Sequence, residues 1–179
     1  MASILQLQIP HAESEATADV LREAVTRVMA VAAVHERLYA HDDPTRVELA
    51  TFIPALLQDI GRSHGSEDTI VCDAAHVVVT AEMAIPLALI INELVTNAIK
   101  YAGPSCRVSL VLSAGTLHVV VGDEGEGPAQ LTDIERPKGI GVKLVDAFAR
   151  QLGAVIDRRK TALGYEIGLR IPFSDAESK

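Results

Sequence analysis

The sequence has no tryptophan, and aromatic residues make up only 3% of its 179 residues. A core with so few large rings must be built from aliphatic side chains, and hydrophobic residues do make up 49% of the chain. This length is enough for one well-cored domain plus an appendage.

Positive charge is also scarce, because the formal net charge is −8. This balance argues against a general surface for nucleic acid or acidic membranes, so we expect no nucleic-acid partner. No apolar run reaches the roughly 18–20 residues that a membrane span needs. The chain also lacks a basic segment followed by an apolar one at its start. We therefore expect no membrane segment in this chain and a cytoplasmic location.

Cysteine is nearly absent, since Cys72 and Cys106 are the only two. Their separation is not that of metal ligands. We expect two reduced thiols in the core of an intracellular protein.

A long helix is predicted from about residue 15 to 41. Its apolar residues alternate steps of four and three, a pattern typical of a helix that packs along its whole length against other helices. The seam comprises Leu21, Val25, Val28, Ala32, His35 and Tyr39. We expect a homodimer through residues 16–41, or close packing of this helix on the rest of the chain, and a packing role for His35. The run Asp42-Asp43-Pro44 ends the helix and marks a domain boundary, so residues 1–44 form the first segment.

Residues 45–173 are predicted to form a two-layer α+β domain, followed by a polar tail at 174–179. One predicted helix covers residues 47–60. A second runs through residues 90–101 and has Pro86 in its first turn. A last helix is opened by Gly139-Ile140-Gly141 and closed by Gly153. The predicted strands cover residues 69–72, 76–79, 108–112, 117–121, 154–158 and 165–171, with Ala114-Gly115 as a hairpin turn.

The helix around residues 90–101 has two unlike faces. Its apolar stripe comprises Leu87, Ile90, Ile91, Leu94, Val95 and Ala98. Glu93, Asn97 and Lys100 are three and four residues apart and share another face. Asparagine is unfavourable in the middle of a helix, so Asn97 calls for a reason. For this helix alone, a solvated polar face remains an equal alternative to a site.

Two glycine motifs follow. Asp123-Glu124-Gly125-Glu126-Gly127 ends a strand, and by itself it is more simply read as a surface turn. Gly139-Ile140-Gly141 precedes a helix, where backbone N–H groups can approach a phosphate. The spacing fits neither a P-loop nor a Rossmann nucleotide site.

The order of these three elements resembles the N, G1 and G2 boxes of the gyrase/Hsp90/histidine-kinase/MutL (GHKL) ATP-binding superfamily. The run from Glu93 to Tyr101 closely resembles the histidine-kinase N box. The run from Arg27 to Tyr39 is similar to the second dimerisation helix of type-2 HisKA sensor kinases, and Ile4 to Gln8 resembles the last turns of their first helix. The resemblance implies a Bergerat α/β sandwich, preceded by a long helix of a dimerisation hairpin, in the catalytic core of a two-component sensor histidine kinase.

Two departures from the family pattern stand out. In this class the phosphoacceptor histidine lies in a His-Arg-x-Lys-Asn run before the segment that Ile4 to Gln8 resembles, so the acceptor is expected to be missing from this chain; His11 is not in such a run. The related HWE kinases have a histidine in the N box and a Trp-x-Glu motif. Here Asn92 takes the N-box position and there is no tryptophan, so the type-2 class fits better.

For the N box, the resemblance implies an ATP site with Mg²⁺. Asn97 would bind Mg²⁺ through its side-chain oxygen, the ligand type that this cation prefers. Glu93 would order a magnesium-bound water or act as a base. Lys100 would neutralise phosphate charge, and Tyr101 could cover the phosphates.

For the G boxes, Asp123 would accept a hydrogen bond from the adenine amino group. Gly125 and Gly127 would let the chain pass close to the nucleotide. Residues 128–138 would form the ATP lid, expected to be mobile without nucleotide, with Lys138 as a phosphate contact. Backbone N–H groups would meet the phosphates at the start of the last helix, which comprises Gly139, Ile140, Gly141 and Val142.

The family reading implies a response regulator as partner and a histidine as the first phosphate acceptor. One alternative is an anti-sigma-factor serine kinase with the same ATP fold, although the long helix 16–41 argues against it. The other is a phosphotransfer or scaffold protein that has lost ATP binding. Intact Asn97, Asp123 and glycine pairs argue against that alternative.

Overall fold

The computed structural model divides the chain into two units, Met1–Asp42 and Asp43–Lys179. The structure describes residues 45–103, 105–123, 140–162 and 164–174, together with Ser14 and Ala32. The predictions for the helix at 15–41 and for the lid at 128–138 therefore lie outside the described residues, apart from Ala32.

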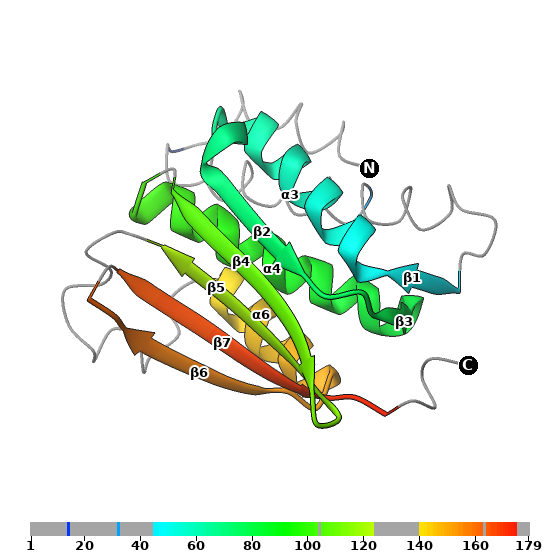
Figure 1. Cartoon of the computed structure of the whole chain (residues 1–179). Helices are drawn as coiled ribbons and strands as arrows, with labels where there is room; N and C mark the ends of the chain where they lie inside the picture. The colour runs from blue at the N-terminus through cyan, green and yellow to red at the C-terminus, as the bar shows by residue number, and fades with distance from the viewer. Residues whose placement is uncertain are drawn as a thin grey trace. The chain divides into compact units, whose positions relative to one another are not determined.

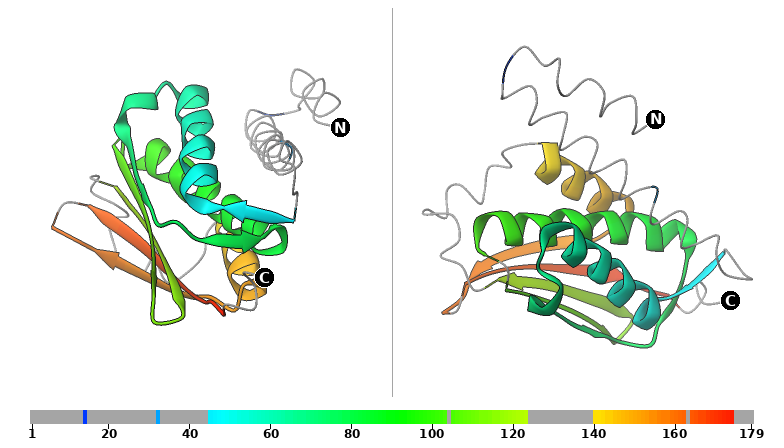
Figure 2. Two further views of the ribbon diagram at one scale, coloured as in Figure 1. Left: turned by 45° about the vertical axis from the view of Figure 1, so that its right-hand side comes forward. Right: turned by 90° about the horizontal axis from the view of Figure 1, so that it is seen from above.

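The described part of the second unit consists of two layers (Figures 1 and 2), in which α3, α4 and α6 lie on one face of a five-stranded sheet. In chain order the elements are β1 (Arg46–Glu48), α3 (Leu49–His64), the 3-10 turn η2 (Glu67–Thr69), β2 (Ile70–Ala74), β3 (Val78–Thr80), α4 (Ala81–Tyr101), β4 (Cys106–Ser113), β5 (Thr116–Asp123), α6 (Ile140–Gln151), β6 (Val155–Lys160) and β7 (Tyr165–Pro172). The predicted two-layer α+β architecture is confirmed.

The strand order in the large sheet is β2-β4-β5-β7-β6, and β1 pairs with β3 in a separate two-stranded sheet. β2 runs parallel to β4, and the other neighbours in the large sheet are antiparallel. The register pairs Gly122 with Glu166 across β5 and β7, and Lys160 with Tyr165 across β6 and β7. These pairings bring the end of β5, the start of β7 and the end of β6 to the same edge of the domain.

The core is aliphatic, as predicted, and α4 supplies much of it. Leu87, Ile90, Ile91 and Val95 of α4 are fully buried. They belong to the same core as fully buried sheet residues such as Leu117. Burial of each such side chain stabilises the fold by about 1.5–3 kcal/mol before entropy is counted. The predicted apolar stripe of α4 is confirmed at all of its positions, since Leu94 and Ala98 are buried as well.

The prediction for α3 was wrong at its start. A helix was expected at 47–60, but residues 46–48 form β1 and pair with β3. The helix begins at Leu49 because the Glu48 carboxylate caps it, accepting hydrogen bonds from the Thr51 N–H at 2.9 Å and hydroxyl at 3.0 Å. It ends where Gly65 adopts φ +65°. Val47 fits the apolar pattern of the helix, but its backbone pairs with that of Val79 in β3, a strand far along the chain.

The prediction that Pro86 falls in the first turn was also wrong, because α4 begins five residues earlier, at Ala81. Thr80, the last residue of β3, is its N-cap residue, and the Ala81 N–H donates to the Thr45 carbonyl at 3.0 Å. Pro86 therefore lies inside α4 and leaves one helical hydrogen bond unmade. By length and composition α4 could cross a membrane, but 72% of its most apolar 18-residue stretch is buried within the protein, as expected of a core helix.

The hairpin and the last helix end as predicted. Ala114 and Gly115 connect β4 to β5 with φ values of +48° and +71°, the signs that a type I′ turn requires. After α6, Gly153 has φ +61°, its N–H donates to the Arg150 carbonyl, and the Ala154 N–H donates to the Ala149 carbonyl. These two bonds form the Schellman motif that a glycine after a helix favours.

Candidate functional site

The polar face of α4 is buried at its middle and exposed at its end. Asn92 and Thr96 are each 7% exposed, and Glu93 is 9% exposed. Asn97 is half-buried, Lys100 is exposed, and Tyr101 is 83% exposed. Because exposure increases only toward the end of the helix, the face is not solvated along its whole length. The alternative of a solvated polar face therefore does not hold for Glu93. Buried carboxylates are rare in proteins unless something pairs with them.

The elements that carry the predicted site lie together. α4 packs against both β5 and α6. The C-terminal end of α4, the end of β5 and the start of β7 lie on the same side of the domain (Figure 1). Asp123 ends β5 and is half-buried, while Gly141 is buried and Val142 half-buried in the first turn of α6.

The other predicted positions are only partly described. Ile140 begins α6, and only its backbone is described. Gly125, Gly127, Lys138 and Gly139 lie outside the described residues. For these four positions the proposed roles remain predictions from the sequence.

Asp123 is held by the neighbouring strand. The Tyr165 N–H donates to Asp123 Oδ1 at 3.2 Å. On the other side, Asp123 pairs in register with Cys106, the first residue of β4. Burial, with a smaller contribution from the Asp123 charge, raises the pKa of the Cys106 thiol to about 12. Cys106 is therefore a neutral core thiol, as predicted, and Cys72 is a half-buried free thiol whose pKa is also raised by burial.

α6 is tied to the sheet by an ion pair. Arg158 Nη2 of β6 lies 2.8 Å from Asp146 Oδ1 of α6. Both side chains are about one quarter exposed, at 23% and 24%. A partly desolvated, hydrogen-bonded pair is stronger than an exposed one. It helps fix α6 against β6, the strand at one edge of the large sheet.

Two buried side-chain oxygens without hydrogen-bond partners lie on the elements of the candidate site. Among the described residues, the buried side-chain oxygens that lack a hydrogen-bond partner are Glu48 Oε1, Thr96 Oγ1 and the Tyr165 hydroxyl. Glu48 lies at the start of α3, where its Oε1 is 3.4 Å from His76 Nδ1. Thr96 is next to Asn97 on α4, and Tyr165 holds Asp123. Unpartnered buried groups are uncommon in native proteins and call for an explanation such as a ligand or water.

The motifs in the sequence did not indicate Thr96 or Tyr165 as candidate site residues. Thr96 could have been found as a polar residue inside an apolar run beside the N box. Tyr165 gave no signal, because an inward-facing tyrosine in a strand is usually a core residue.

The described residues fit a magnesium nucleotide. They contain no cluster of three or more His, Cys, Asp and Glu side chains that could hold a metal ion by themselves. Mg²⁺ commonly takes one or two protein oxygens and completes its shell with phosphate oxygens and water. The half-buried amide of Asn97, one turn from the buried carboxylate of Glu93, suits that arrangement.

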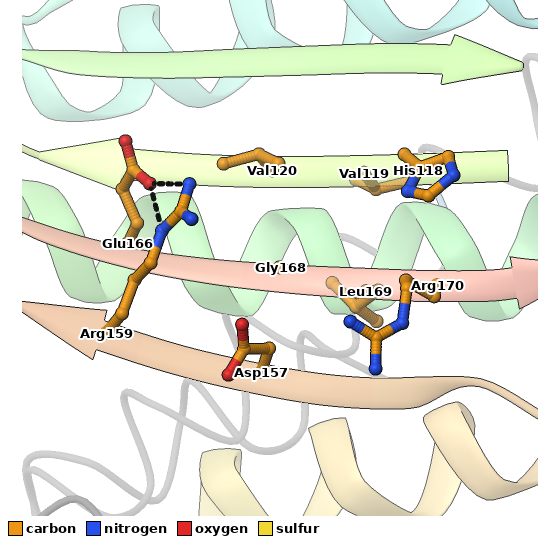
Figure 3. Close-up of a pocket in the computed structure, with 9 residues that line it drawn as sticks. All are labelled: His118, Val119, Val120, Asp157, Arg159, Glu166, Gly168, Leu169 and Arg170. Atoms are coloured by element: carbon orange, nitrogen blue, oxygen red, sulfur yellow. Dashed lines mark hydrogen bonds and ion pairs between the residues drawn. The ribbon is translucent and has the colours of Figure 1, made fainter. Parts of the chain in front are cut away.

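A different hollow, of about 230 Å³, lies on the face of the sheet opposite to α3, α4 and α6 (Figure 3). It opens above Gly168 and is bordered by His118, Asp157, Arg170 and the Arg159–Glu166 ion pair. This volume is below the range of about 300–1,000 Å³ usual for small-molecule sites. It contains none of the predicted site residues, so we do not place the nucleotide there.

Two family models match the chain. Residues 1–64 match one described as histidine kinase, and residues 68–170 match one described as histidine kinase-like ATPase domain. Among curated proteins, the sensor histidine kinase PdtaS of Mycobacterium tuberculosis is 29% identical over 184 residues, covering 96% of this chain. PdtaS of Mycolicibacterium smegmatis is 27% identical over 183 residues, covering 97% of this chain. The chain spans about a third, 36%, of the length of these relatives.

Solved structures show the same fold. The histidine kinase domain of the blue-light activated histidine kinase EL346 from Erythrobacter litoralis matches with a TM-score of 0.72 at 23% identity, covering 99% of this chain and 85% of that one. The Acinetobacter baumannii histidine kinase AdeS matches with a TM-score of 0.64 at 17% identity, covering 96% and 94%. With the two family models covering most of its length, the chain belongs to the histidine kinases, as a type-2 HisKA segment followed by a histidine kinase-like ATPase domain.

Proposed function

We propose that this chain binds magnesium ATP between α4, the end of β5 and the start of α6, and serves as the catalytic core of a sensor kinase. In that role it would direct the γ-phosphoryl group to a histidine of a dimerisation hairpin, and from there to an aspartate of a response regulator. The supporting observation is the buried Glu93 beside the half-buried Asn97, on a helix that packs against both β5 and α6.

The role that we propose for each α4 residue is consistent with its solvent exposure. Asn97 would offer its amide oxygen to Mg²⁺, and the buried Glu93 would hold a water or accept a proton. Lys100 and Tyr101, at the exposed end of the helix, can reach phosphates that project toward solvent. Bound magnesium ATP would supply the phosphoryl group, and phosphoryl transfer asks the protein mainly for positioning and charge neutralisation.

The strand and glycine positions would hold the rest of the nucleotide. Asp123, fixed by the Tyr165 N–H, would accept from the adenine amino group. Gly125 and Gly127 would allow the close approach of the chain, and Lys138 would contact phosphate. The N–H groups of Gly139, Ile140, Gly141 and Val142 open α6, where the helix dipole favours negative charge.

The proposal keeps the division predicted from the sequence, with a dimerisation segment at 1–44, the ATP domain at 45–173 and a tail at 174–179. The serine-kinase alternative is less favoured because residues 1–64 match a histidine kinase model. We propose that dimerisation uses residues 16–41.

Transfer of radiolabelled phosphate tests the proposal. This chain has six histidines, and none lies in a His-Arg-x-Lys-Asn run, so we expect the chain alone to form little acid-labile phosphohistidine. In-line transfer needs the acceptor at roughly 3–3.5 Å, and a misplaced histidine loses most of the rate. Robust labelling of any of the six would show that the acceptor is misassigned.

The matched experiment supplies the acceptor in trans. A type-2 kinase that carries its own His-Arg-x-Lys-Asn run, but a defective N-box asparagine, should be phosphorylated by this chain. The same mixture with Asn97→Ala should show no phosphorylation of the acceptor protein. Arg170→Ala, on the opposite face of the sheet, should phosphorylate it as the wild type does. Equal labelling with Asn97→Ala would contradict the assignment.

A further inference from the structure

Tyr165 has a buried hydroxyl with no partner. The residue is 8% exposed, and its hydroxyl oxygen makes no hydrogen bond within the protein. A buried hydroxyl without a partner is destabilising, whereas a phenylalanine at the same place would not carry that penalty. The tyrosine therefore calls for a functional reason.

The ring of Tyr165 lies on the same side of the sheet as the Asp123 carboxylate. The β5–β7 register ends at Gly122 and Glu166, so Asp123 and Tyr165 occupy the next positions outward. Side chains alternate along each strand, which places Asp123 and Tyr165 with the buried Val121 and Leu169 on the face that α4 covers. The 3.2 Å bond from the Tyr165 N–H to Asp123 Oδ1 confirms that the two residues are adjacent.

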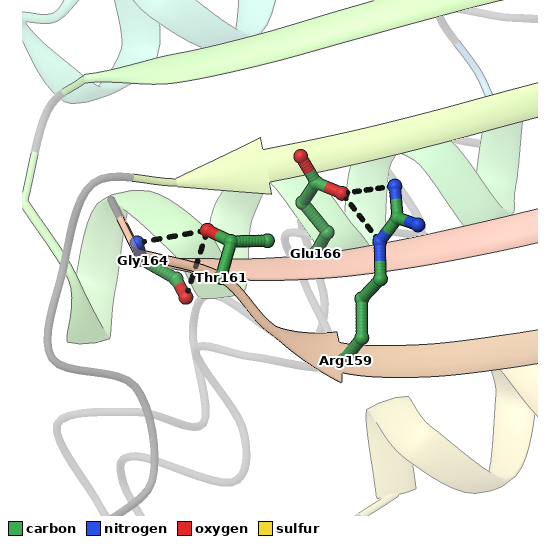
Figure 4. A network of polar contacts seen from close by, with 4 residues as sticks. All are labelled: Arg159, Thr161, Gly164 and Glu166. Atoms are coloured by element: carbon green, nitrogen blue, oxygen red, sulfur yellow. Dashed lines mark hydrogen bonds and ion pairs between the residues drawn. The ribbon is translucent and has the colours of Figure 1, made fainter.

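Side-chain and backbone contacts flank Tyr165 on both sides at the start of β7 (Figure 4). Before it, the Thr161 N–H donates to the Gly164 carbonyl at 2.8 Å, and the Gly164 N–H donates to Thr161 Oγ1 at 3.1 Å. After it, Arg159 reaches Glu166 with Nε at 2.7 Å and Nη2 at 2.6 Å. Tyr165 is thus positioned before any ligand binds, which lowers the entropy lost on binding.

The Tyr165 hydroxyl is also kept protonated, the form in which it can donate a hydrogen bond. Burial raises the pKa of Tyr165; Arg158 opposes this shift, while the negative charges of Asp123 and Asp157 add to it. At neutral pH the group is therefore a neutral O–H donor beside a carboxylate acceptor.

We propose that Tyr165 is a specificity-determining residue of the nucleotide site, whose hydroxyl donates to a ring nitrogen next to the adenine amino group, N1 or N7. The inference rests on the proposed function, in which Asp123 accepts from that amino group. An acceptor and a donor side by side match adenine, which presents its amino donor next to ring-nitrogen acceptors. Guanine presents a carbonyl acceptor in place of that amino group and would face the Asp123 carboxylate unfavourably.

An atom-deletion cycle on the whole chain tests this inference. Calorimetry would compare magnesium ADP with its 1-deaza, 7-deaza and 3-deaza analogues, on the wild type and on Tyr165→Phe. For the wild type we expect either the 1-deaza or the 7-deaza analogue to bind about 3- to 10-fold more weakly than ADP, the effect of one neutral hydrogen bond. Tyr165→Phe should weaken ADP by the same factor and show no further loss with that analogue.

Two controls separate this role from a structural one. The 3-deaza analogue lacks a nitrogen that is not next to the amino group, so its affinity relative to ADP should be the same in both proteins. Tyr165→Phe should unfold at the same urea concentration as the wild type or a higher one, since an unpartnered hydroxyl has been removed.

Two results would overturn the inference while leaving the proposed function intact. One is an unchanged affinity of Tyr165→Phe for ADP. The other is that the affinity lost through Tyr165→Phe and the affinity lost through the deaza substitution simply add when the two are combined. No binding of magnesium ADP to the wild type would overturn both. If Tyr165→Phe does not fold, equal wild-type affinity for ADP and all three analogues still refutes the role of Tyr165, and selective loss with the 1-deaza or 7-deaza analogue supports it.

Discussion

Replacing Ala114 with asparagine should stabilise the protein. Ala114 has φ +48° in the two-residue turn between β4 and β5, and Gly115 follows with φ +71°. The left-handed conformation costs a residue with an ordinary Cβ about 1–2 kcal/mol. Asparagine tolerates it, and Asn-Gly is the preferred pair for this turn. We expect Ala114→Asn to recover about 0.5–1 kcal/mol of that cost.

Urea unfolding followed by circular dichroism measures the effect. For a slope of about 2–3 kcal/mol per M, the midpoint should rise by about 0.2–0.5 M with an unchanged slope. Ala114→Gly should gain less, because the glycine also increases the entropy of the unfolded chain by about 0.4–1 kcal/mol.

Gly115→Ala is the opposing control in the same turn. It places a Cβ at positive φ and 3.4 Å from the Phe173 carbonyl oxygen, so the midpoint should fall by a similar or larger amount. A lower midpoint for Ala114→Asn, or no effect of Gly115→Ala, would refute this account of the turn.

Two further stability predictions follow from the electrostatics of the sheet. Asp146→Asn removes the partly buried partner of Arg158 and should lower the free energy of unfolding in urea by about 1 kcal/mol. Glu166→Gln, whose partner Arg159 is 64% exposed, should change that free energy by no more than about 0.5 kcal/mol. Equal effects of the two substitutions would contradict the difference in burial. Because burial raises the pKa of Cys106 from 9.0 to about 12, the unfolded chain releases this proton first as pH rises. The contribution of this thiol to the free energy of unfolding should therefore stay constant below about pH 9 and fall between pH 9 and about 12. Cys106→Ala should show a shallower fall, and rapid alkylation of Cys106 in the folded protein at pH 8.5 would contradict its burial.

The features predicted correctly were those that local sequence determines. The apolar period of α4, the alternation on both sides of Ala114-Gly115 and the glycine after α6 each act within a few residues. The start of α3 was misplaced because Val47 pairs with Val79, a residue far along the chain, and no local pattern reports that pairing.

The candidate site could be proposed from the sequence only where a motif indicated it. The run from Glu93 to Tyr101 resembles the N box, but its spacing could not show that Glu93 is buried while Tyr101 is exposed. Tyr165 was missed for a related reason. The role that we propose for it depends on its place beside Asp123 across two strands, and on a hydroxyl that packing leaves without a partner.

Magnesium-dependent nucleotide binding is the central claim, and calorimetry tests it most directly. Magnesium ADP would be titrated into the wild type, Asn97→Ala, Asp123→Asn and the control Arg170→Ala, each shown to be folded by circular dichroism. Loss of a hydrogen bond to a charged group weakens binding by roughly 10- to 100-fold, so Asp123→Asn should show a loss of this order with or without Mg²⁺. Asn97→Ala should abolish the gain that Mg²⁺ gives the wild type, and Arg170→Ala should bind normally. Tight magnesium-dependent binding that neither site substitution changes would contradict the account.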